Sequence, residues 1–464
     1  MLRMFVALWA VLLSQGVIAQ SKQSVDLIVN GDYVLTMEPG AAVIPQGAVA
    51  VKGGAIVAVG SQQEIAGNFA AARTVSGTNK VLMPGMVNGH THTSMVLFRG
   101  MADDLPLMTW LQNYIFPMEG RYVDAALVEA GTRLACYEMI KSGTTSFVDM
   151  YFYPDVISDV VVDCGMRAIV GAPMIDFPSP GFKGWDDSFA AGVDYVKRWN
   201  GKHPRITPAL APHAPYTVSL DHLRAAFGAA RDLNVPVSIH VSEDQAGIKT
   251  AQERYGMTPI DLLEGVGMLG QRTVAAHVVW PTDSEIQKLA GSLAGPIHNP
   301  TSNMKTGAGI SPVPQMLEAG VNVGLGTDGA ASNNDLNLWQ EMRLAALIHK
   351  GVSNDPTVVT AQQALDMATR MGANAVGLGD IVGTLEAGKR ADLIQVSFDS
   401  PRFDPLYNVA SHLVYVATGE DVVTSIIDGQ IVMLDGEVST IDIAKMRQDV
   451  EAIAQKIRQD LESR

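Results

Sequence analysis

The chain has 464 residues, of which 47% are hydrophobic and 44 are glycine, and this composition fits a compact enzyme with many tight turns rather than a disordered protein. The length allows one large α/β domain and a smaller one. The formal net charge of −15 argues against nucleic acid and against an anionic membrane surface as partners. The partner that we expect is a small-molecule substrate.

The first residues have the pattern of an export signal. Arg3 gives a positive start, an apolar core runs from Phe5 to Leu13, and Val17 to Ala19 form a small-residue cleavage site. The core is shorter than the roughly 20 residues that span a bilayer. We therefore predict that residues 1–19 are a signal peptide and that the product is exported without a membrane attachment, to the periplasm if the source is a Gram-negative bacterium. A retained N-terminal anchor is the alternative.

Short apolar stretches separated by turn dipeptides occur near both chain ends. The first set runs from Val25 to Gly60, with turns at Asn30-Gly31 and Gly53-Gly54, and the second runs from Ala391 to Leu434, with a turn at Asp428-Gly429. This pattern predicts one small β-sandwich domain built from residues 20–80 and 385–440.

Between these sets, eight apolar runs suited to buried strands alternate with helical stretches. The predicted strands are Val81 to Val87, Thr145 to Asp149, Arg167 to Ala172, Ile206 to Ala211, Val235 to His240, Thr273 to His277, Ala294 to His298 and Val321 to Thr327. Eight strand–helix units in roughly 250 residues predict an α/β fold of the (β/α)8 TIM-barrel type over residues 81–384. A doubly wound open sheet is the alternative, but no glycine-rich dinucleotide turn follows any of the runs. Residues 441–464 have helical periodicity and predict a C-terminal surface helix.

Histidine and aspartate recur where these predicted strands end. The pattern begins with His90 and His92, two residues apart and therefore on the same side of a strand. The other strand-end residues are Asp149, His213, His240 (with Glu243 behind it), His277, His298 and Asp328. Because a barrel carries its reactive groups at the carboxyl ends of its strands, these residues predict a metal site with acid–base groups around it. A lone strand-end histidine is more often structural, but five of eight strand ends carry one, out of only 10 histidines in the chain.

The two cysteines, Cys136 and Cys164, lie in apolar surroundings and in no CxxC pattern. They fit either one disulfide in an oxidising compartment or two separate buried thiols.

The motifs at these strand ends resemble those of the amidohydrolase superfamily. Within it, they are similar to the 5-methylthioadenosine/S-adenosylhomocysteine deaminases, a group of adenosine-type deaminases close to the triazine chlorohydrolases. In chain order they are PGMVNGHTHTSM, FVDMYFYPD, APHAPYT, HVSE, AAHVVW, HNPTSN and GTDGAASNN. The similarity extends from about Val25 to about Gly436.

The resemblance implies one zinc ion per subunit, held by His90, His92, His240 and Asp328. Three imidazole nitrogens and one carboxylate are ligands that suit zinc and leave a position for water, although Fe²⁺ or Ni²⁺ would accept the same ligands. Relatives with two metals insert a modified lysine at the end of strand four. Residues 205–217 contain no lysine, so we expect a mononuclear site.

The same resemblance assigns the catalytic groups. Hydrolytic deamination needs a nucleophile made from water, for which zinc lowers the pKa of water towards about 7. It also needs groups that move protons to the ring and to the departing ammonia. Glu243 is expected to shuttle these protons, His277 to orient the water, and Asp328 to accept a proton besides binding the metal. For Glu243 the structural alternative is a carboxylate that favours a helix start.

Substrate contacts are expected from Glu119, His213 and Trp110, in addition to Glu243. Glu119 matches the family residue that accepts hydrogen bonds from ribose hydroxyls, and His213 matches a contact at strand four. Trp110 could form a wall of the purine pocket. The structural alternatives are a solvated loop carboxylate for Glu119 and ordinary packing for Trp110. Structural roles are expected for His298, Asn299, Ser332 and Asn333.

The chain departs from the family at the residues that bind the amino acid tail of S-adenosylhomocysteine. Ala172 occupies the position of the first tail-binding arginine, and Lys183 is the only nearby cation for the second. A substrate carboxylate would lose its fork-shaped partner. This departure weighs against S-adenosylhomocysteine more than against adenosine or 5′-methylthioadenosine.

Three hypotheses follow for the function. The first is a zinc-dependent deaminase of an adenosine-like nucleoside, which yields the inosine analogue and ammonia. The second is hydrolysis of another bond on the same scaffold, such as C–Cl or C–N cleavage in a triazine or opening of a cyclic amide. The third is an exported binding protein without turnover, which would need no proton shuttle at Glu243. Whether the subunits form a homo-oligomer is left open.

Overall fold

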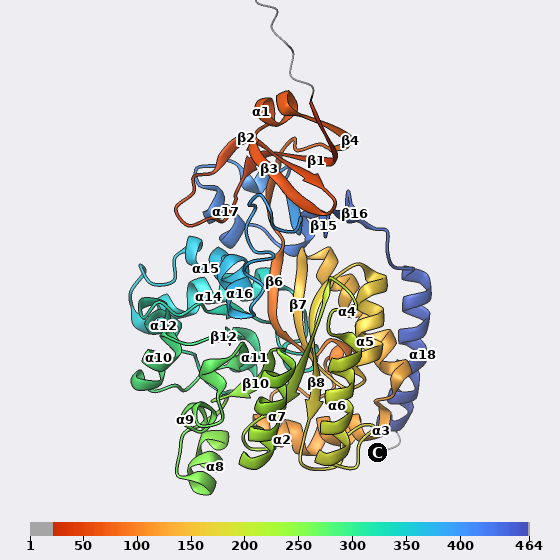
Figure 1. Ribbon diagram of the computed structural model, residues 1–464, viewed down its shortest axis with the longest axis vertical. Coiled ribbons are helices and arrows are strands. Elements are labelled where there is room, and N and C mark those ends of the chain that lie inside the picture. The colour runs from red at the N-terminus through yellow and green to blue at the C-terminus, as the bar shows by residue number, and fades with distance from the viewer. Residues whose placement is uncertain (1–21, 463–464) are drawn as a thin grey trace, which may run out of the picture.

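The computed structural model describes residues 22–462, which form a barrel with a smaller β domain at one end (Figure 1). The predicted signal peptide, residues 1–19, lies outside the described residues. No helix in the described range is both long and apolar enough to cross a membrane.

Eight parallel strands form the barrel, in the sheet order β13-β12-β11-β10-β9-β8-β7-β6. Their bounds are β6 (Met86–Thr91), β7 (Thr144–Met150), β8 (Arg167–Met174), β9 (Ile206–Pro212), β10 (Val237–Val241), β11 (Thr273–His277), β12 (Ala294–His298) and β13 (Gly324–Leu325). Nearly every residue in them is buried, as expected for parallel strands covered by helices outside and packed side chains inside. The predicted (β/α)8 fold is confirmed.

One strand prediction was wrong, because the run from Val81 to Val87 contains two strands. Lys80–Pro84 is β5 and belongs to the smaller sheet, whereas Met86 begins β6 of the barrel. Gly85 separates them: its backbone N–H donates to the carbonyl of Asp392, and a Cβ atom there would lie 2.1 Å from the hydroxyl of Thr145. The chain therefore passes from one domain into the other at a residue that has no room for a side chain.

The barrel closes between its first and last strands. The backbone N–H of Asp328 donates to the carbonyl of His90 over 2.9 Å. The side chain of Asn88 accepts a hydrogen bond from the backbone N–H of Thr327 and donates one to its hydroxyl. These contacts hold two predicted metal ligands, His90 and Asp328, against each other at the seam.

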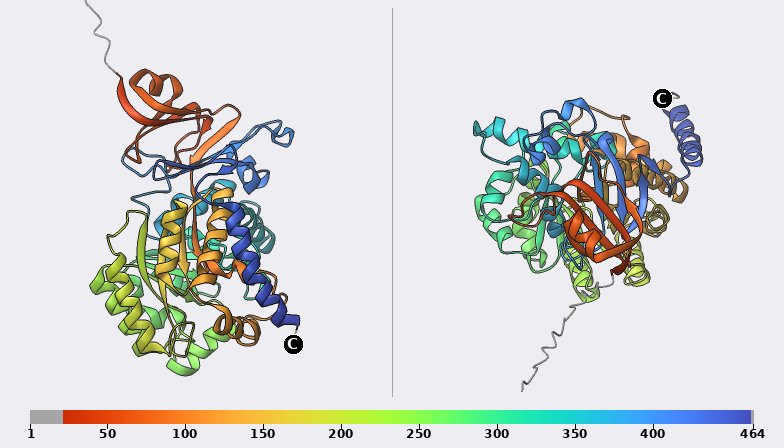
Figure 2. Two further views of the ribbon diagram at one scale, coloured as in Figure 1. Left: turned by 90° about the vertical axis from the view of Figure 1, so that its right-hand side faces the viewer. Right: turned by 90° about the horizontal axis from the view of Figure 1, so that it is seen from above.

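Both chain ends contribute to the smaller sheet, which confirms the predicted composite β domain. Its strands are β1 (Gln23–Val34), β2 (Ile44–Lys52), β3 (Ala55–Ser61), β4 (Phe69–Val75), β5, β14 (Leu393–Ser397), β15 (Val422–Ile427), β16 (Gln430–Leu434) and β17 (Glu437–Val438). They form a nine-stranded sheet in which β5 pairs with β1 on one side and with β14 on the other. In Figures 1 and 2 the red N-terminal strands and the blue C-terminal strands lie together at one end of the barrel.

Helices surround the barrel and lie in the connections between its strands. Those that follow strands β6 to β9 include α2 (Leu107–Trp110), α3 (Phe116–Tyr122), α4 (Ala125–Lys141), α5 (Pro154–Cys164), α6 (Trp185–Trp199) and α7 (Leu220–Leu233). Those after β10 to β13 are α8 (Gln245–Tyr255), α9 (Pro259–Glu264), α10 (Asp283–Ala290), α11 (Pro300–Lys305), α12 (Val313–Glu318), α13 (Ala330–Asn333), α14 (Leu338–Ser353), α15 (Ala361–Ala368) and α16 (Arg370–Ala375). The smaller domain carries α1 (Gln62–Asn68) and α17 (Val409–Tyr415).

The predicted C-terminal helix is α18 (Ile443–Glu462). It lies along the outside of the barrel beside α4, as Figures 1 and 2 show. Met446 and Ile457 are buried in this contact.

Cys136 on α4 and Cys164 at the end of α5 are free thiols, both fully buried. They lie close enough that Cys164 contributes, together with burial, to raising the pKa of Cys136. Of the two alternatives that the sequence left open, the structure has two buried thiols.

Candidate metal centre and active site

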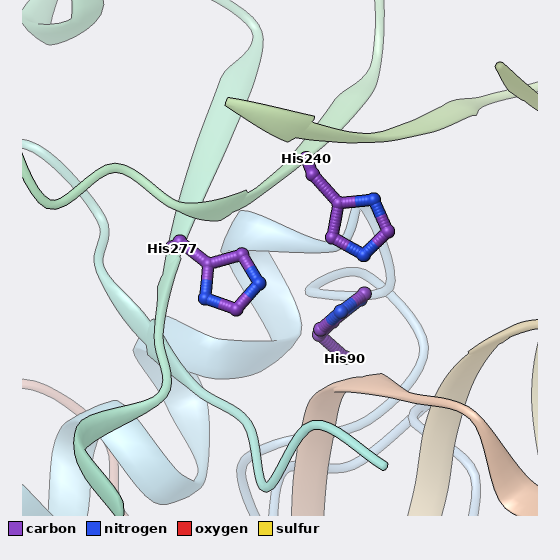
Figure 3. A group of neighbouring side chains, drawn as sticks. All are labelled: His90, His240 and His277. Carbon is purple, nitrogen blue, oxygen red and sulfur yellow. The ribbon is translucent and has the colours of Figure 1, made fainter. Parts of the chain in front are cut away.

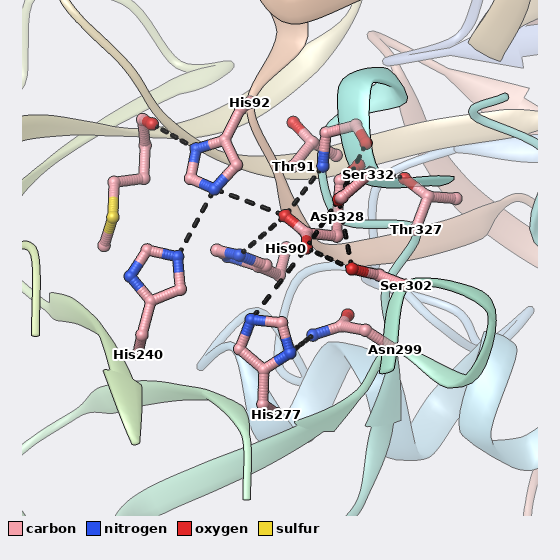
Figure 4. Close-up of polar contacts among 12 residues, drawn as sticks. His90, Thr91, His92, His240, His277, Asn299, Ser302, Thr327, Asp328 and Ser332 are labelled. Carbon is pink, nitrogen blue, oxygen red and sulfur yellow. Dashed lines mark hydrogen bonds and ion pairs between the residues drawn. The ribbon is translucent and has the colours of Figure 1, made fainter. Parts of the chain in front are cut away.

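Four of the predicted metal ligands converge at the carboxyl end of the barrel strands. His90 and His92 lie at the end of β6, His240 near the end of β10, and Asp328 three residues after β13. Asp328 Oδ1 lies 3.4 Å from His90 Nε2 and 3.3 Å from His92 Nε2, and His92 Nε2 lies 3.3 Å from His240 Nε2. Figure 4 shows these side chains pointing at one common space.

Two of the imidazoles are fixed in the ring state that a metal needs. His92 Nδ1 lies 2.6 Å from the carbonyl oxygen of Met150, and His240 Nδ1 lies 2.6 Å from that of His213. A carbonyl oxygen can only accept, so each Nδ1 carries the proton and each Nε2 offers a lone pair to the shared space. Such contacts commonly orient histidine ligands of metals in proteins.

The donor atoms fit a divalent cation. Lone pairs of two Nε2 atoms at 3.3 Å repel each other unless a positive charge lies between them. Donors about 2.0–2.1 Å from a tetrahedral zinc ion are about 3.3–3.4 Å from one another, which matches all three measured separations. Both ring nitrogens of His90 are buried without a hydrogen-bond partner among the described residues, and a bound metal would give a partner to one of them, Nε2.

The carboxylate of Asp328 is strongly stabilised in its charged form. Oδ2 accepts hydrogen bonds from the hydroxyls of Ser302 (2.6 Å) and Ser332 (2.9 Å), and Oδ1 accepts one from the backbone N–H of Gly329 (2.7 Å). Burial would raise the pKa of Asp328, but the neighbouring histidines hold it well below its usual value. Burial likewise lowers the pKa of His92, yet Asp328 outweighs it and raises that pKa to about 9. The site therefore favours a positive charge beside Asp328.

His277 and Glu243 lie on one side of this centre. His277 Nε2 is 3.6 Å from Glu243 Oε1 and 4.0 Å from Asp328 Oδ2, and Figure 3 shows its ring facing His90 and His240. One nitrogen each of His90, His240 and His277 lies within 4.8 Å of the others. Both His277 (φ 75°) and Asp328 (φ 63°) adopt left-handed backbone conformations, which are uncommon for residues other than glycine.

An amide oxygen sets the ring state of His277. Its Nδ1 lies 2.8 Å from Asn303 Oδ1, so we assign the proton to Nδ1 and a free lone pair to Nε2. Asn299 Nδ2 lies 3.2 Å from the same nitrogen. The Nε2 atom is buried and has no hydrogen-bond partner within the described chain, which leaves it free to contact a water molecule.

Glu243 is a buried carboxyl group with one direct partner. The hydroxyl of Tyr216 donates to Glu243 Oε2 over 3.3 Å. Burial raises the pKa of Glu243, and the charge of Asp328 raises it further, while His277 and Tyr216 act against this shift. A carboxyl group whose pKa is raised towards neutrality is suited to both accept and deliver a proton.

A cavity opens onto this centre. The three predicted substrate contacts, Trp110, Glu119 and His213, all line it, together with Glu243 and the metal-site residues His92, His240 and Asp328. Most of the remaining wall is apolar and comes from the segment between Leu107 and Phe116 and from the residues after β7 and β8. The structure thus brings every predicted site residue to one cavity or its floor.

The predicted placement of Ala172 was wrong. It faces α6 rather than the active site: a Cβ atom at Gly192 of α6 would lie 3.3 Å from that of Ala172, and Ala172 lines a separate cavity. Pro173 and Ile175 line the active site instead, because side chains alternate along β8. Lys183 is exposed, and none of the described residues that line the active site is a lysine or an arginine.

Two expected structural roles also need correction. His298 makes no hydrogen bond through its ring within the described residues, and its ring lies 5.2 Å from that of His349. Ser332 binds Asp328 directly and lines the cavity. Asn333 has the expected structural role, since its amide donates to the Thr327 carbonyl and to Glu341.

Several site residues were missed from the sequence. Tyr216, Ser302 and Asn303 contact side chains that were predicted to be catalytic, and Tyr151 lines the cavity. Three of them lie within two motifs that were recognised, Tyr216 in APHAPYT and Ser302 and Asn303 in HNPTSN. Tyr151 lies in FVDMYFYPD, directly after Met150, whose carbonyl oxygen accepts from His92.

A family model and two similar proteins agree with this architecture. The model of the amidohydrolase family matches residues 81–432. A 5-methylthioadenosine/S-adenosylhomocysteine deaminase from Syntrophobacter fumaroxidans is 44% identical over 432 residues, which cover 93% of this chain and 98% of that protein. A 5′-deoxyadenosine deaminase from Methanococcoides burtonii is 42% identical over 414 residues, 88% of this chain and 92% of that protein.

Two solved structures superpose on this chain over most of its length. An adenosine deaminase from Xanthomonas campestris with bound zinc superposes with a TM-score of 0.92 at 39% identity, over 95% of this chain and 100% of that one. An atrazine chlorohydrolase from Arthrobacter aurescens superposes with a TM-score of 0.84 at 24% identity, over 92% of this chain and 100% of that one. At this lower identity the likeness concerns the fold alone.

Proposed function

This chain belongs to the amidohydrolase family and hydrolyses C–N bonds, and we propose that its substrate is an adenosine-like nucleoside, which it converts into the inosine analogue and ammonia. The observation that carries the proposal is the convergence of His90, His92, His240 and Asp328 beside Glu243, on the floor of a cavity that also holds Glu119. The relatives with the highest identities reported above are named as deaminases of such nucleosides.

We propose that the four converging side chains hold one Zn²⁺ per subunit. The ligand types alone would also suit Fe²⁺ or Ni²⁺, but the donor separations match tetrahedral zinc. When bound, such an ion lowers the pKa of a water molecule so that it is a nucleophile at neutral pH.

Glu243 would move the protons of the reaction. Water adds to the ring carbon that bears the amino group, one proton of that water passes to Glu243, and Glu243 delivers it to the adjacent ring nitrogen. The amino group then accepts a second proton and departs as ammonia, which leaves a carbonyl group on the ring. The Nε2 lone pair of His277, 3.6 Å from Glu243, would orient the water molecule, because Nδ1 already donates to Asn303.

The cavity favours a nucleoside without a charged tail. Glu119 is a buried acceptor suited to ribose hydroxyls, and Trp110 and the surrounding apolar wall suit a purine ring. No cation among the described lining residues is available to pair with a tail carboxylate. Adenosine, 5′-methylthioadenosine and 5′-deoxyadenosine are therefore favoured over S-adenosylhomocysteine.

Ammonia release by the purified, zinc-loaded protein tests this function. The panel contains those four nucleosides, together with atrazine and a cyclic amide for the alternative hydrolase activity. We expect turnover of the three neutral nucleosides and a kcat/KM at least about 10-fold lower for S-adenosylhomocysteine, since a lost ion pair in a buried site costs at least that factor. The proposal is overturned if no nucleoside releases ammonia, and turnover of atrazine or the cyclic amide alone would favour the second hypothesis.

A further inference from the structure

Tyr151 is a buried residue of the active site to which the proposed mechanism gives no role. It follows β7 directly, lines the cavity, and is 3% exposed. Its ring lies 6.3 Å from that of His92. Because the carbonyl oxygen of the preceding residue, Met150, accepts from His92, the backbone of Tyr151 is fixed relative to the metal centre.

The hydroxyl of Tyr151 is free to bind a ligand. It is buried and makes no hydrogen bond of normal geometry within the part of the chain that the structure describes, although the Glu119 carboxyl group lies close enough to raise its pKa. Buried hydroxyl groups normally have a partner, and one that lacks it in a cavity wall is available to a molecule bound there.

Glu119 is an ionisable neighbour of that hydroxyl. It lies on α3, is 6% exposed and lines the same cavity. Burial is the main cause that raises the pKa of each residue, and each also influences the pKa of the other. The two polar groups therefore face the cavity as neighbours, from elements far apart in the sequence.

The two groups complement a pair of adjacent hydroxyls. A carboxylate only accepts hydrogen bonds, whereas a phenol donates one and can also accept. Each hydroxyl of a vicinal diol donates one hydrogen bond and accepts others. One hydroxyl can thus donate to Glu119 while the oxygen of its neighbour accepts from Tyr151, so that both buried groups are satisfied.

We propose that Tyr151 donates a hydrogen bond to one of the two ribose hydroxyls of the substrate, beside Glu119, which the family resemblance already assigns to these hydroxyls. This inference rests on the proposed nucleoside substrate and adds a specificity-determining residue to it. A site built to hydrogen-bond a hydroxyl discriminates strongly against analogues that lack it, because its own buried polar groups then stay unpaired.

The test combines Tyr151→Phe with substrates that lack one or both hydroxyls. For full-length, zinc-loaded protein, kcat/KM is measured with adenosine, 2′-deoxyadenosine, 3′-deoxyadenosine and 2′,3′-dideoxyadenosine. We expect the substitution to lower kcat/KM for adenosine about 10- to 100-fold, the range of one buried hydrogen bond. With the dideoxynucleoside, and with whichever monodeoxynucleoside lacks the Tyr151-bound hydroxyl, the loss should be below about twofold.

Tyr153→Phe is the matched control. Its hydroxyl belongs to the separate cavity beside α6, so its removal should leave all four kcat/KM values within about twofold of the parent protein. An equal loss with all four substrates in Tyr151→Phe would assign Tyr151 to the chemistry or the fold and overturn the proposal. No loss with adenosine would overturn it as well.

Calorimetric titration with inosine and 2′,3′-dideoxyinosine separates this proposal from the proposed deaminase activity. Neither ligand carries an amino group, so binding is measured without turnover. Tighter binding of inosine that disappears in Tyr151→Phe supports the diol-binding pair even if no nucleoside is deaminated. Equal binding of both ligands by the parent protein overturns the pair even if deamination is observed.

Discussion

His92 and His240 come from strands on different parts of the barrel sheet, yet their Nε2 atoms lie 3.3 Å apart, with each Nδ1 held by a backbone carbonyl. The negative charge of Asp328 beside them favours a cation in this space, either a proton on His92, whose pKa is raised to about 9, or a metal ion. Removal of the metal by a chelator should abolish ammonia release and lower the melting temperature. The free energy of unfolding should be about 4 kcal/mol higher at a metal concentration of 1,000 times Kd than in the metal-free protein.

The measurement is a thermal melt and elemental analysis before and after chelation, followed by addition of Zn²⁺. His240→Ala should lose the bound metal, whereas His412→Ala on α17, far from the centre, should retain one ion per chain. Full metal occupancy in His240→Ala would contradict the assignment of this ligand.

Glu243→Gln keeps the shape of the side chain but cannot carry the proton. We expect kcat to fall about 10²- to 10⁴-fold, the usual contribution of a general acid–base group, with unchanged metal content. Tyr216→Phe removes only the hydrogen bond to Glu243 Oε2. This variant should therefore lower kcat by about 10-fold or less. Steady-state kinetics with adenosine compares the two variants. A Glu243→Gln enzyme with more than a tenth of the parent kcat would exclude Glu243 as the proton shuttle.

We expect the ionisation of Glu119 to make substrate binding, and hence kcat/KM, depend on pH. Burial raises its pKa to about 7, so the carboxyl group is protonated below pH 7 and ionised above it. The ionised form makes the stronger, charge-assisted hydrogen bond to a hydroxyl. In the profile of kcat/KM, which reports pKa values of the free enzyme, activity with adenosine should rise as the pH increases through about 7. Glu119→Gln should lack this rise, and so should the parent protein with 2′,3′-dideoxyadenosine, whereas a rise shared by all three would assign it to another group.

We expect Asn303 to affect catalysis through His277, without itself contacting the substrate. Its Oδ1 accepts from Nδ1 of His277 and thereby keeps the Nε2 lone pair directed at the centre. Asn303→Ala should lower kcat about 10- to 100-fold, as losses of such supporting contacts commonly do, and leave the metal bound. Because the ring state would change, the pH profile should shift too, which a purely structural role would not cause. Asn333→Ala serves as the control for a loosened loop, since Asn333 binds Thr327 and Glu341 but not His277.

The sequence predicted the parts of this site that are tied to strand ends. His90, His92, His240, His277 and Asp328 all follow apolar strand runs, and the geometry of a parallel barrel then brings the carboxyl ends together. The same rule predicted the position of Glu243. The apolar pattern of the strands and the geometry of the barrel are together sufficient to place these residues.

Other features of the structure depend on contacts between distant residues and on strand register, which the apolar runs of the sequence do not reveal. The division of the run from Val81 to Val87 between two sheets follows from the tight packing of Gly85 against Thr145, a contact between distant residues. The orientation of Ala172 follows from the register of β8, in which a shift of one residue exchanges the two faces. Tyr151 and Asn303 resemble ordinary polar loop residues until the loops are placed in space.

The last prediction concerns the junction of the two domains. Arg167 at the start of β8 forms two hydrogen bonds with Asp392, which precedes β14, over 2.8 and 3.0 Å, and both side chains are nearly fully buried. Loss of Asp392 leaves the buried Arg167 with only its longer, 3.3 Å contact to Asp428, and removing one partner of a buried ion pair typically costs about 3–5 kcal/mol. Asp392→Ala should therefore lower the melting temperature strongly, whereas Glu451→Ala, which removes an exposed pair with Arg458 on α18, should change the stability by less than about 1 kcal/mol. The double variant Arg167→Met/Asp392→Leu should regain much of the loss, because the buried guanidinium is gone and Asp428 keeps its ion pair with Arg390. Thermal melts of the four proteins test this, and an Asp392→Ala protein as stable as the parent would show that the ion pair does not hold the domains together.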